Sequence, residues 1–342
     1  MNKIKKWLLI SLLISFISGL IVILLTFDTG TIDALLSIKP EFILLGICLH
    51  AFSYLIWGMR IRVLCRALGH DIGVIKSVEI VTSSALAASI TPSSLGGEPL
   101  RIHLLNMDRM SLGKASAVIL GERLLDGILI LSLAPFSIYI FRNILADSGF
   151  ETILIVAEFF LVGILLLLMY AIWRPGPTRS FSYFIVNRIT PFFSDRTDAK
   201  IEHVIKKVDN ELDNFHESIV LLLKEGRKGL MIAIFGTLLF WVVEFSLLYV
   251  VLLGLNLHVD ILAVFASQII IMLLMVLPAT PGASGVAELG AATVFSIFVP
   301  SHVLGITVLA WRALTFYMNL IVGSFVSFKI LRDTDSIGKV LR

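Results

Sequence analysis

Charged residues are scarce in this sequence. Of its 342 residues, 15% are Asp, Glu, Lys or Arg, whereas 57% are hydrophobic. Soluble domains carry about a quarter charged residues, because their surfaces must interact with water. The low charge and a mean hydropathy of +0.95 exclude a soluble globular protein and indicate a chain that functions within a lipid bilayer.

Residues suited to metal or thiol chemistry are also few. The two cysteines, Cys48 and Cys65, fall on one predicted helix, about 25 Å apart at about 1.5 Å per residue, so they cannot form a disulfide. The seven histidines are scattered and form no paired metal-binding pattern. No nucleotide-binding loop is present. We therefore expect no metal site, no cofactor and no nucleic-acid partner.

Long uncharged stretches predict transmembrane helices. About 20 residues of helix cross the hydrocarbon layer, and the backbone must be helical because lipid cannot satisfy its hydrogen bonds. We predict an all-α polytopic membrane protein with about seven full spans plus two re-entrant hairpins. The spans that we delimit are 7–27, 42–63, 115–141, 152–173, 229–252 and 303–330. The first stretch is too long for a signal-peptide core and lacks a small-residue cleavage site, so we expect it to remain as an anchor.

Basic residues indicate the orientation of the spans. Lys and Arg gather in five segments, which are 3–6, 60–76, 109–114, 174–228 and 329–342. The connections between them contain only Lys39 and Arg142, and these connections are 28–41, 142–151 and 253–260. By the positive-inside rule, we predict a multi-pass protein of the cell membrane with both termini in the cytoplasm.

Two further apolar segments, 77–108 and 260–300, are interrupted by Gly, Pro, Ser and Thr, and these interruptions predict re-entrant hairpins. The first is flanked by basic residues at both ends and should enter from the cytoplasm, whereas the second has none and should enter from outside. The break residues are Thr91, Pro92, Ser94, Gly96 and Gly97 in the first hairpin, and Thr280, Pro281, Gly282, Ser284 and Gly285 in the second.

The two halves of the chain, 42–141 and 229–330, align in register. Thr-Pro at the first break matches Thr-Pro at the second, Gly96 matches Gly285, and an arginine, Arg123 or Arg312, follows each threonine by 32 residues. Because the hairpins are expected to enter from opposite sides, the alignment predicts an inverted-topology repeat. This organisation is common in secondary transporters.

The segment 174–228 is the long hydrophilic part of the chain, and we expect it in the cytoplasm. Within 201–222, apolar residues recur at alternating spacings of four and three, which predicts an amphipathic helix. Three arrangements stay open for it: packing on the membrane face or on its own bundle, a homodimeric coiled coil, or docking of a cytoplasmic partner.

Charged residues inside the membrane are the candidates for a functional site. Each costs roughly 2.5–3.5 kcal/mol at the centre of a span on insertion scales, so it must be paired or face a cavity. The candidates for substrate binding and translocation are Glu98, Arg101, Glu122, Arg123, Asp126, Glu288 and Arg312, with Glu244 as a further intramembrane carboxylate.

The chemistry of these side chains leaves several roles open. The guanidinium groups of Arg123 and Arg312 match the geometry of phosphate. Glu98 and Glu288 fall in the first turns of half-helices, where they could cap the helix, bind a cationic head group or take up a proton. The spacing of three places Glu98 and Arg101 on one helix face, and likewise Arg123 and Asp126. The alternative for all these charges is that they form internal ion pairs that fasten the hairpins to the spans. We expect no catalytic residue, because no base accompanies the serines.

Three motifs resemble a known family. They are Thr-Pro-Ser-Ser-Leu-Gly-Gly-Glu-Pro-Leu-Arg (91–101), Gly-Glu-Arg-Leu-Leu-Asp (121–126) and Leu-Pro-Ala-Thr-Pro-Gly-Ala-Ser-Gly-Val-Ala-Glu (277–288). They resemble the lysylphosphatidylglycerol synthase transmembrane-region family, the membrane half of the bacterial multiple-peptide-resistance factor, together with its stand-alone bacterial and archaeal relatives.

The resemblance implies a lipid flippase with membrane lipids as its partners. The cargo would be an anionic or aminoacylated phospholipid, or a polyprenyl-phosphate-linked lipid. The sequence ends at Arg342, soon after the last span, so we expect no aminoacyl-transferase domain and no enzyme activity. Two alternatives stay open: a membrane glycosyl- or lipid-modifying transferase, although no Asp-x-Asp falls in a loop between spans, or a non-catalytic partner of a cytoplasmic enzyme.

Overall fold

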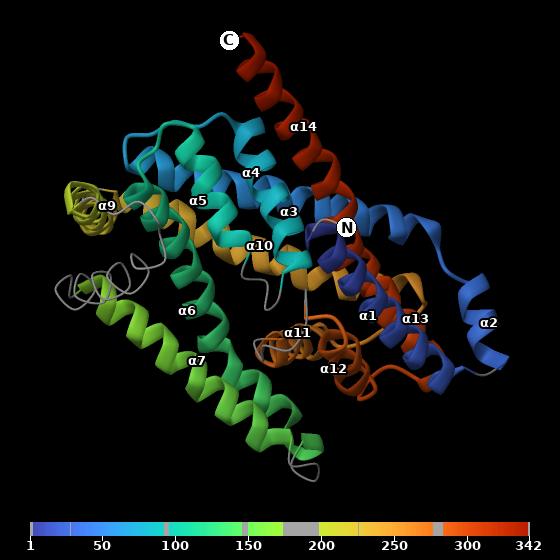
Figure 1. The fold of residues 1–342 in the computed structure, drawn as a ribbon. Helices are drawn as coiled ribbons and strands as arrows, with labels where there is room; N and C mark the ends of the chain where they lie inside the picture. Colours follow the sequence, from blue (N-terminus) through green and yellow to red (C-terminus); the bar gives the residue numbers. More distant parts are fainter. Residues whose placement is uncertain are drawn as a thin grey trace.

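The computed structural model of the protein is a bundle of helices (Figure 1). It describes residues 3–27, 29–91, 96–145, 150–173, 198–224, 226–275 and 283–340. In these residues every regular element is helical, which confirms the predicted all-α class.

Four helices among the described residues are long and apolar enough to cross a membrane. They are α3 (Pro40–Ala67), α6 (Leu112–Leu145), α10 (Arg227–Gly254) and a continuous run of α13 (Ser301–Arg312), the π-helical turn η3 (Ala313–Tyr317) and α14 (Met318–Val340). The predicted spans 7–27 and 152–173 correspond to α1 (Lys3–Thr26) and α7 (Phe150–Trp173). The count of about seven full spans stays a prediction.

Each predicted hairpin consists of two short helices on either side of its break. The first pair is α4 (Val74–Ile90) and α5 (Gly97–Met107), and the second is α11 (Ile261–Met275) and α12 (Val286–Phe295). Helices α5, α11 and α12 have 11, 15 and 10 residues, fewer than the roughly 20 that a full crossing needs. Whether the pairs are re-entrant depends on the position of the bilayer, so that part of the prediction stays untested.

The first break is closed by the hydroxyl group of Thr91. Its Oγ1 donates a hydrogen bond to the carbonyl oxygen of Ala87 at 2.7 Å and accepts one from the backbone N–H of Gly96 at 2.9 Å. A Cβ atom on Gly96 would lie 2.6 Å from Cγ2 of Thr91, so only glycine fits there. Thr91 therefore joins the end of α4 to the start of α5, while Pro92 and Ser94 lie outside the described residues.

The second break ends in a glycine with a left-handed backbone. Gly285 has φ of +88°, a conformation that other residues rarely adopt. Oε2 of Glu288 accepts a hydrogen bond from the backbone N–H of Gly285 at 2.5 Å, so Glu288 caps α12, one of the roles open to it from the sequence. Thr280, Pro281 and Gly282 lie outside the described residues.

Helices α3 and α10 form the central antiparallel pair. The backbone N–H of Lys39, just before α3, donates a hydrogen bond to the carbonyl oxygen of Gly254 at the end of α10. At the other end, a Cβ on Gly229 near the start of α10 would lie 3.0 Å from Cβ of Ala67. Small residues allow this close approach, as is usual between helices in membranes.

Helices that occupy the same position in the two aligned halves, such as α4 and α11 or α5 and α12, make corresponding contacts. Helix α4 packs against α3, α5 and α14, and α11 packs against α10, α12 and α6. Helix α5 contacts α6, and α12 contacts α13. The two hairpins thus each pack on the long helix of the opposite half as well as on their own.

The predicted amphipathic helix corresponds to α9 (Asp198–Lys224), which packs mainly on α6. Oε2 of Glu211 accepts a hydrogen bond from the backbone N–H of Gly113 at 2.7 Å. Ile219 and Leu222 from the apolar stripe are buried in a core with residues of α3 and α6. The C-terminal part of the stripe therefore packs on its own bundle, and a homodimer or a cytoplasmic partner at 201–222 stays a prediction.

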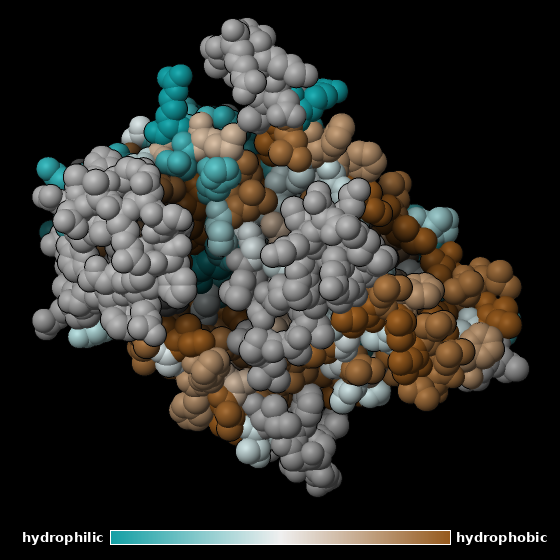
Figure 2. All heavy atoms as spheres, viewed as in Figure 1, coloured by the Kyte–Doolittle hydropathy of each residue, from teal (hydrophilic) through white to brown (hydrophobic). Residues whose placement is uncertain are grey.

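The surface is divided by polarity (Figure 2). Hydrophilic residues gather at the upper end of the molecule, near α4 and α5, and hydrophobic residues cover much of its lower part and the side around α1 and α2 (Thr29–Leu36). Large apolar side chains such as Leu25 and Phe325 are 80% and 76% exposed. Such exposure fits a lipid-facing surface.

Candidate functional site

The structure brings the charged residues of the first half together. Three arginines and three carboxylates from α3, α5 and α6 form one cluster, the charge cluster, which consists of Arg60, Glu98, Arg101, Glu122, Arg123 and Asp126. With three groups of each sign, its formal charges cancel. Neutrality fits a site in a low-dielectric environment, where an unpaired charge is expensive.

Glu122 lies at the centre of the charge cluster and is fully buried. Its Oε2 lies 2.7 Å from Nη1 of Arg101, and its Oε1 lies 3.5 Å from Nη2 of Arg60. Nη2 of Arg60 also lies 2.7 Å from Oδ1 of Asp126. The guanidinium carbon of Arg101 stands 5.2 Å from the ring centre of Trp57. The first hairpin is therefore fastened to α6 through a buried ion pair and to α3 through the contact of Arg101 with the Trp57 ring, while Arg60 joins α3 to α6.

Arg60 is a member of the charge cluster that the sequence did not single out. It lies next to Arg62 and Arg66 at the end of α3 and was read with them as a basic flank. In the fold it is only 2% exposed, because α10 approaches it closely: a Cβ on Gly236 would lie 2.8 Å from Cγ of Arg60. The repeat contained a signal for it: Trp57 of the first half aligns with Trp241 of the second, and a charged residue, Arg60 or Glu244, follows each tryptophan by three positions.

Arg123 lies at the rim of the charge cluster. Its Nε lies 2.8 Å from Oε1 of Glu98, and its Nη1 lies 3.6 Å from Oδ2 of Asp126. Its side chain is 37% exposed. With Asp126, Trp241 and Met272 it lines a cavity of about 260 Å³ between α6, α7, α10 and α11, the Arg123 cavity.

The second-half charges form a smaller group around Arg312, which is 3% exposed. Nε of Arg312 lies 2.8 Å from Oε1 of Glu288, and its Nη2 donates to Oγ of Ser284 at 3.4 Å. Its guanidinium carbon lies 4.1 Å from the ring centre of Phe316. Glu288 thus both caps α12 and pairs with the arginine, which fixes the second hairpin to α13.

Arg312 lines a second cavity of about 250 Å³, the Arg312 cavity. Its polar lining consists of Ser89, Glu244, Gln268, Arg312, Thr315 and Asn319, and its aromatic lining consists of Trp57, Trp241, Phe245, Trp311 and Phe316. Two buried donors in this wall, Nε2 of Gln268 and Nε1 of Trp311, have no hydrogen-bond partner among the described residues. Buried donors are nearly always satisfied in proteins, so a partner from outside the described residues is expected for these two.

The two cavities share part of their walls. Trp241 and Met272 line both, so these two side chains separate the surroundings of Arg123 from those of Arg312. Nε1 of Trp241 donates a hydrogen bond to Oδ1 of Asp126 at 3.0 Å, which holds the indole against the charge cluster.

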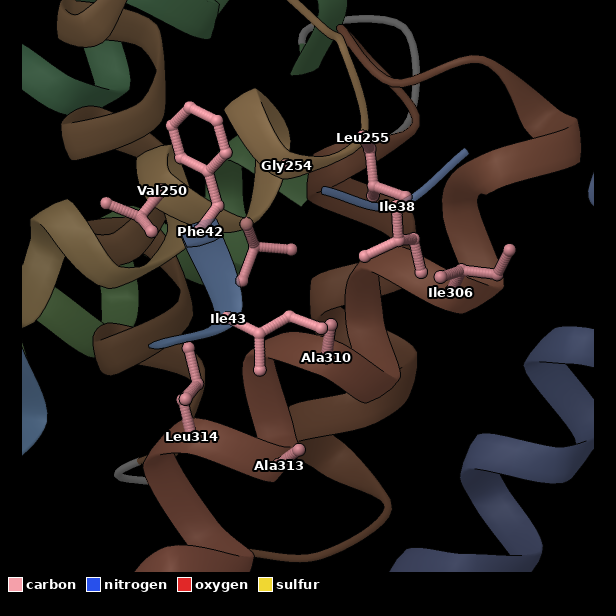
Figure 3. A pocket seen from close by; sticks show the side chains of 11 residues that line it. Ile38, Phe42, Ile43, Val250, Gly254, Leu255, Ile306, Ala310, Ala313 and Leu314 are labelled. Atoms are coloured by element: carbon pink, nitrogen blue, oxygen red, sulfur yellow. The ribbon is translucent and has the colours of Figure 1, made fainter. Parts of the chain in front are cut away.

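A third hollow is lined by apolar residues (Figure 3). This aliphatic groove has a volume of about 200 Å³ and lies between the start of α3, the end of α10 and the segment from α13 to η3. Ala310 and Leu314 line it, whereas Trp311 and Thr315 line the Arg312 cavity, so the two hollows lie on opposite faces of one helical segment. The groove offers no polar side chain and fits a hydrocarbon chain rather than a head group.

Comparison with known proteins agrees with this architecture. The family described as lysylphosphatidylglycerol synthase TM region matches residues 8–323. The chain belongs to this family. The segments 91–101 and 277–288 contain the two breaks, and 91–101 and 121–126 contain five of the six residues of the charge cluster, all but Arg60.

Several archaeal proteins named UPF0104 membrane protein are similar to this member of the family. One from Archaeoglobus fulgidus is 29% identical over 293 residues, which are 85% of this chain and 87% of the relative. One from Methanocaldococcus jannaschii is 24% identical over 331 residues, 95% of this chain and 96% of the relative. One from Methanothermobacter thermautotrophicus is 25% identical over 303 residues, 85% and 86% of the two chains. No solved structure matches.

Proposed function

We propose that the protein is a lipid translocase of the cell membrane, in which a phosphate-containing head group occupies the Arg312 cavity while the lipid tails stay in the bilayer. The observation that carries this proposal is the pair of unpartnered buried donors, Gln268 Nε2 and Trp311 Nε1, in the same wall as Arg312. Membership of the family supports a lipid as the cargo.

The donors favour phosphate because they need an acceptor. A buried polar group without a partner costs about 1–3 kcal/mol, and a ligand oxygen that accepts its hydrogen bond removes this cost. Phosphate supplies several such oxygens, and a guanidinium group is its usual protein partner. The cargo that fits is an anionic or aminoacylated phospholipid, or a polyprenyl-phosphate-linked lipid.

The two arginines that the repeat aligns have different roles in this proposal. Arg123 is balanced by Glu98 and Asp126 within a neutral charge cluster, which supports a bracing role with access to the Arg123 cavity. Arg312 has one carboxylate partner, Glu288, and lines the cavity with the free donors. We therefore assign the main phosphate contact to Arg312, and to the charge cluster the fastening of the first hairpin.

We also propose that the chain is an inverted-topology repeat with re-entrant hairpins and cytoplasmic termini. The corresponding contacts of α4 with α14 and of α11 with α6 support it. In such transporters one repeat moves against the other around a site near the midplane. Trp241 and Met272, which separate the two cavities, would then move for a head group to pass between them.

Reconstitution tests the proposal. The purified full chain in liposomes should accelerate the movement of fluorescent phosphatidylglycerol or polyprenyl phosphate between leaflets. Trp311→Phe keeps the ring and removes the N–H, and Gln268→Leu removes the amide, so each should slow this movement. Asp71→Asn in the loop before α4 serves as the control and should not change it. The absence of protein-dependent movement across the whole lipid panel would falsify the proposal.

A further inference from the structure

A buried histidine and a glutamate face each other across the central pair of helices, outside the proposed phosphate contacts. His50 on α3 is 3% exposed, and its Nδ1 lies 3.4 Å from Oε1 of Glu244 on α10. The Glu244 side chain is 18% exposed and lines the Arg312 cavity. The carboxylate thus lies between the imidazole and the cavity.

The other imidazole nitrogen is also connected to the Arg312 cavity. Nε2 of His50 lies 3.2 Å from the hydroxyl oxygen of Tyr54, and this hydroxyl donates a hydrogen bond to Oδ1 of Asn319. Asn319 lines the same cavity. Nδ1 is therefore connected to the cavity through Glu244, and Nε2 through Tyr54 and Asn319. This arrangement suits a group that gains and loses a proton. Imidazole is the side chain that does so near neutral pH.

The charges around the Arg312 cavity leave a deficit of one positive charge. Arg312 from α13 and Glu288 from α12 cancel, and Arg60 from α3 balances Asp126 from α6 behind Trp241.

Among the residues that the structure describes, other groups near the cavity do not correct the deficit. Tyr54 on α3 faces His50, and Tyr317 on η3 neighbours Arg312, but a phenol side chain supplies no positive charge. Helices α4 and α11 contribute Ser89 and Gln268, which do not titrate. The carboxylate of Glu244 therefore leaves one negative charge, which a proton on the His50–Glu244 pair neutralises.

We propose that the His50–Glu244 pair is a proton-binding site that couples head-group binding to proton uptake. This inference rests on the proposed function, because the phosphate would lie in the cavity that the Glu244 carboxylate lines. An unprotonated pair repels a phosphate at Arg312, whereas a protonated pair does not. By linkage, the phosphate then raises the affinity of the pair for its proton by the same factor. The head group and one proton bind together.

Proton uptake can be measured separately from lipid movement. With one proton bound for each head group, the affinity for an anionic lipid should fall as pH rises, by at most about tenfold per pH unit. Proteoliposomes of phosphatidylcholine that contain the full chain, labelled phosphatidylglycerol and an internal pH dye report lipid movement and proton movement together.

Two amide variants separate the contributions of the pair. Glu244→Gln mimics the protonated carboxylate, so lipid movement should stay at the low-pH rate of the wild type at every pH. His50→Gln leaves the Glu244 charge uncompensated, so movement should be slow at every pH. His103→Gln on α5 removes an exposed histidine and should keep the wild-type pH profile.

The outcomes distinguish this inference from the proposed function. Proton uptake with phosphatidylglycerol movement, lost in His50→Gln, supports the coupling. Lipid movement without proton movement, or with proton release, overturns the coupling and leaves the translocase intact. The same holds if both amide variants keep the wild-type pH profile. A chain that moves no lipid overturns the translocase, and the coupling with it.

Discussion

Removing the charge of Glu122 should destabilise the protein more than removing any exposed carboxylate. Glu122 is fully buried and lies 2.7 Å from Arg101 and 3.5 Å from Arg60. Glu122→Gln changes the charge cluster from neutral to a net charge of +1 without a change in side-chain volume. Breaking a buried ion pair in this way costs about 3–5 kcal/mol, because it leaves a buried charge uncompensated.

A double-mutant cycle tests whether the lost charge balance is the cause. The double variant Glu122→Gln, Arg101→Gln restores neutrality, so it should be more stable than the sum of the single variants predicts, by about 2 kcal/mol of coupling energy. Unfolding of the purified protein in mixed micelles measures the free energy for each variant. Asp71→Asn is the control, since an ion pair exposed to solvent contributes little to stability.

Two results would contradict this role of Glu122: a loss of stability in Glu122→Gln no larger than in Asp71→Asn, or effects of the two single variants that simply add. Either result would mean that the charge cluster does not fasten the first hairpin to the spanning helices. Lipid movement is measured on the same variants. If Glu122 only stabilises the packing of the first hairpin, its removal lowers the free energy of unfolding before it slows lipid movement.

Two further predictions concern local structure. Gly285→Ala should destabilise the protein by about 1–3 kcal/mol, because an L residue at a φ of +88° is strained; thermal unfolding measures the loss, and an unchanged midpoint contradicts the assigned backbone. In the loop after α3, hydrogen bonds from Arg66 lower the pKa of Asp71. This surface ion pair should therefore stabilise the folded protein above the ordinary pKa of Asp, near pH 3.9. The stabilisation should be lost as pH falls through the lower pKa of the folded state. Chemical-shift titration of the Asp71 carboxyl carbon checks the direction, and a raised pKa contradicts it.

The sequence predicted the broken helices because their signals are local. In both halves a Thr-Pro is followed five residues after the threonine by glycine, and the predicted hairpins 77–108 and 260–300 each fall on a pair of short helices. The spacing of three also identified the Glu98–Arg101 contact correctly, at 3.5 Å. Local spacing did not indicate the π-helical turn η3 or the short helix α2, which lack comparable sequence signals.

The cluster itself could not be assembled from spacing alone. Its closest contacts, Arg101 with Glu122 and Arg60 with Asp126, join residues on different helices, and a single sequence does not fix which helices meet. The repeat made Arg123 and Arg312 look equivalent. Each pairs at 2.8 Å with the glutamate of its own hairpin, Glu98 or Glu288. Their further surroundings differ because Glu122 and Asp126 of the first half align with Trp311 and Thr315 of the second, which carry no charge.

The proposal that a lipid head group occupies the Arg312 cavity is tested most directly by photocrosslinking. Phosphatidylglycerol with a photoreactive head group should label residues of this cavity, among them Gln268 and Met272, in the reconstituted chain, and excess unlabelled lipid should remove the label. Labelling confined to lipid-facing side chains, such as Leu25 and Phe325, and unaffected by competitor would contradict the account.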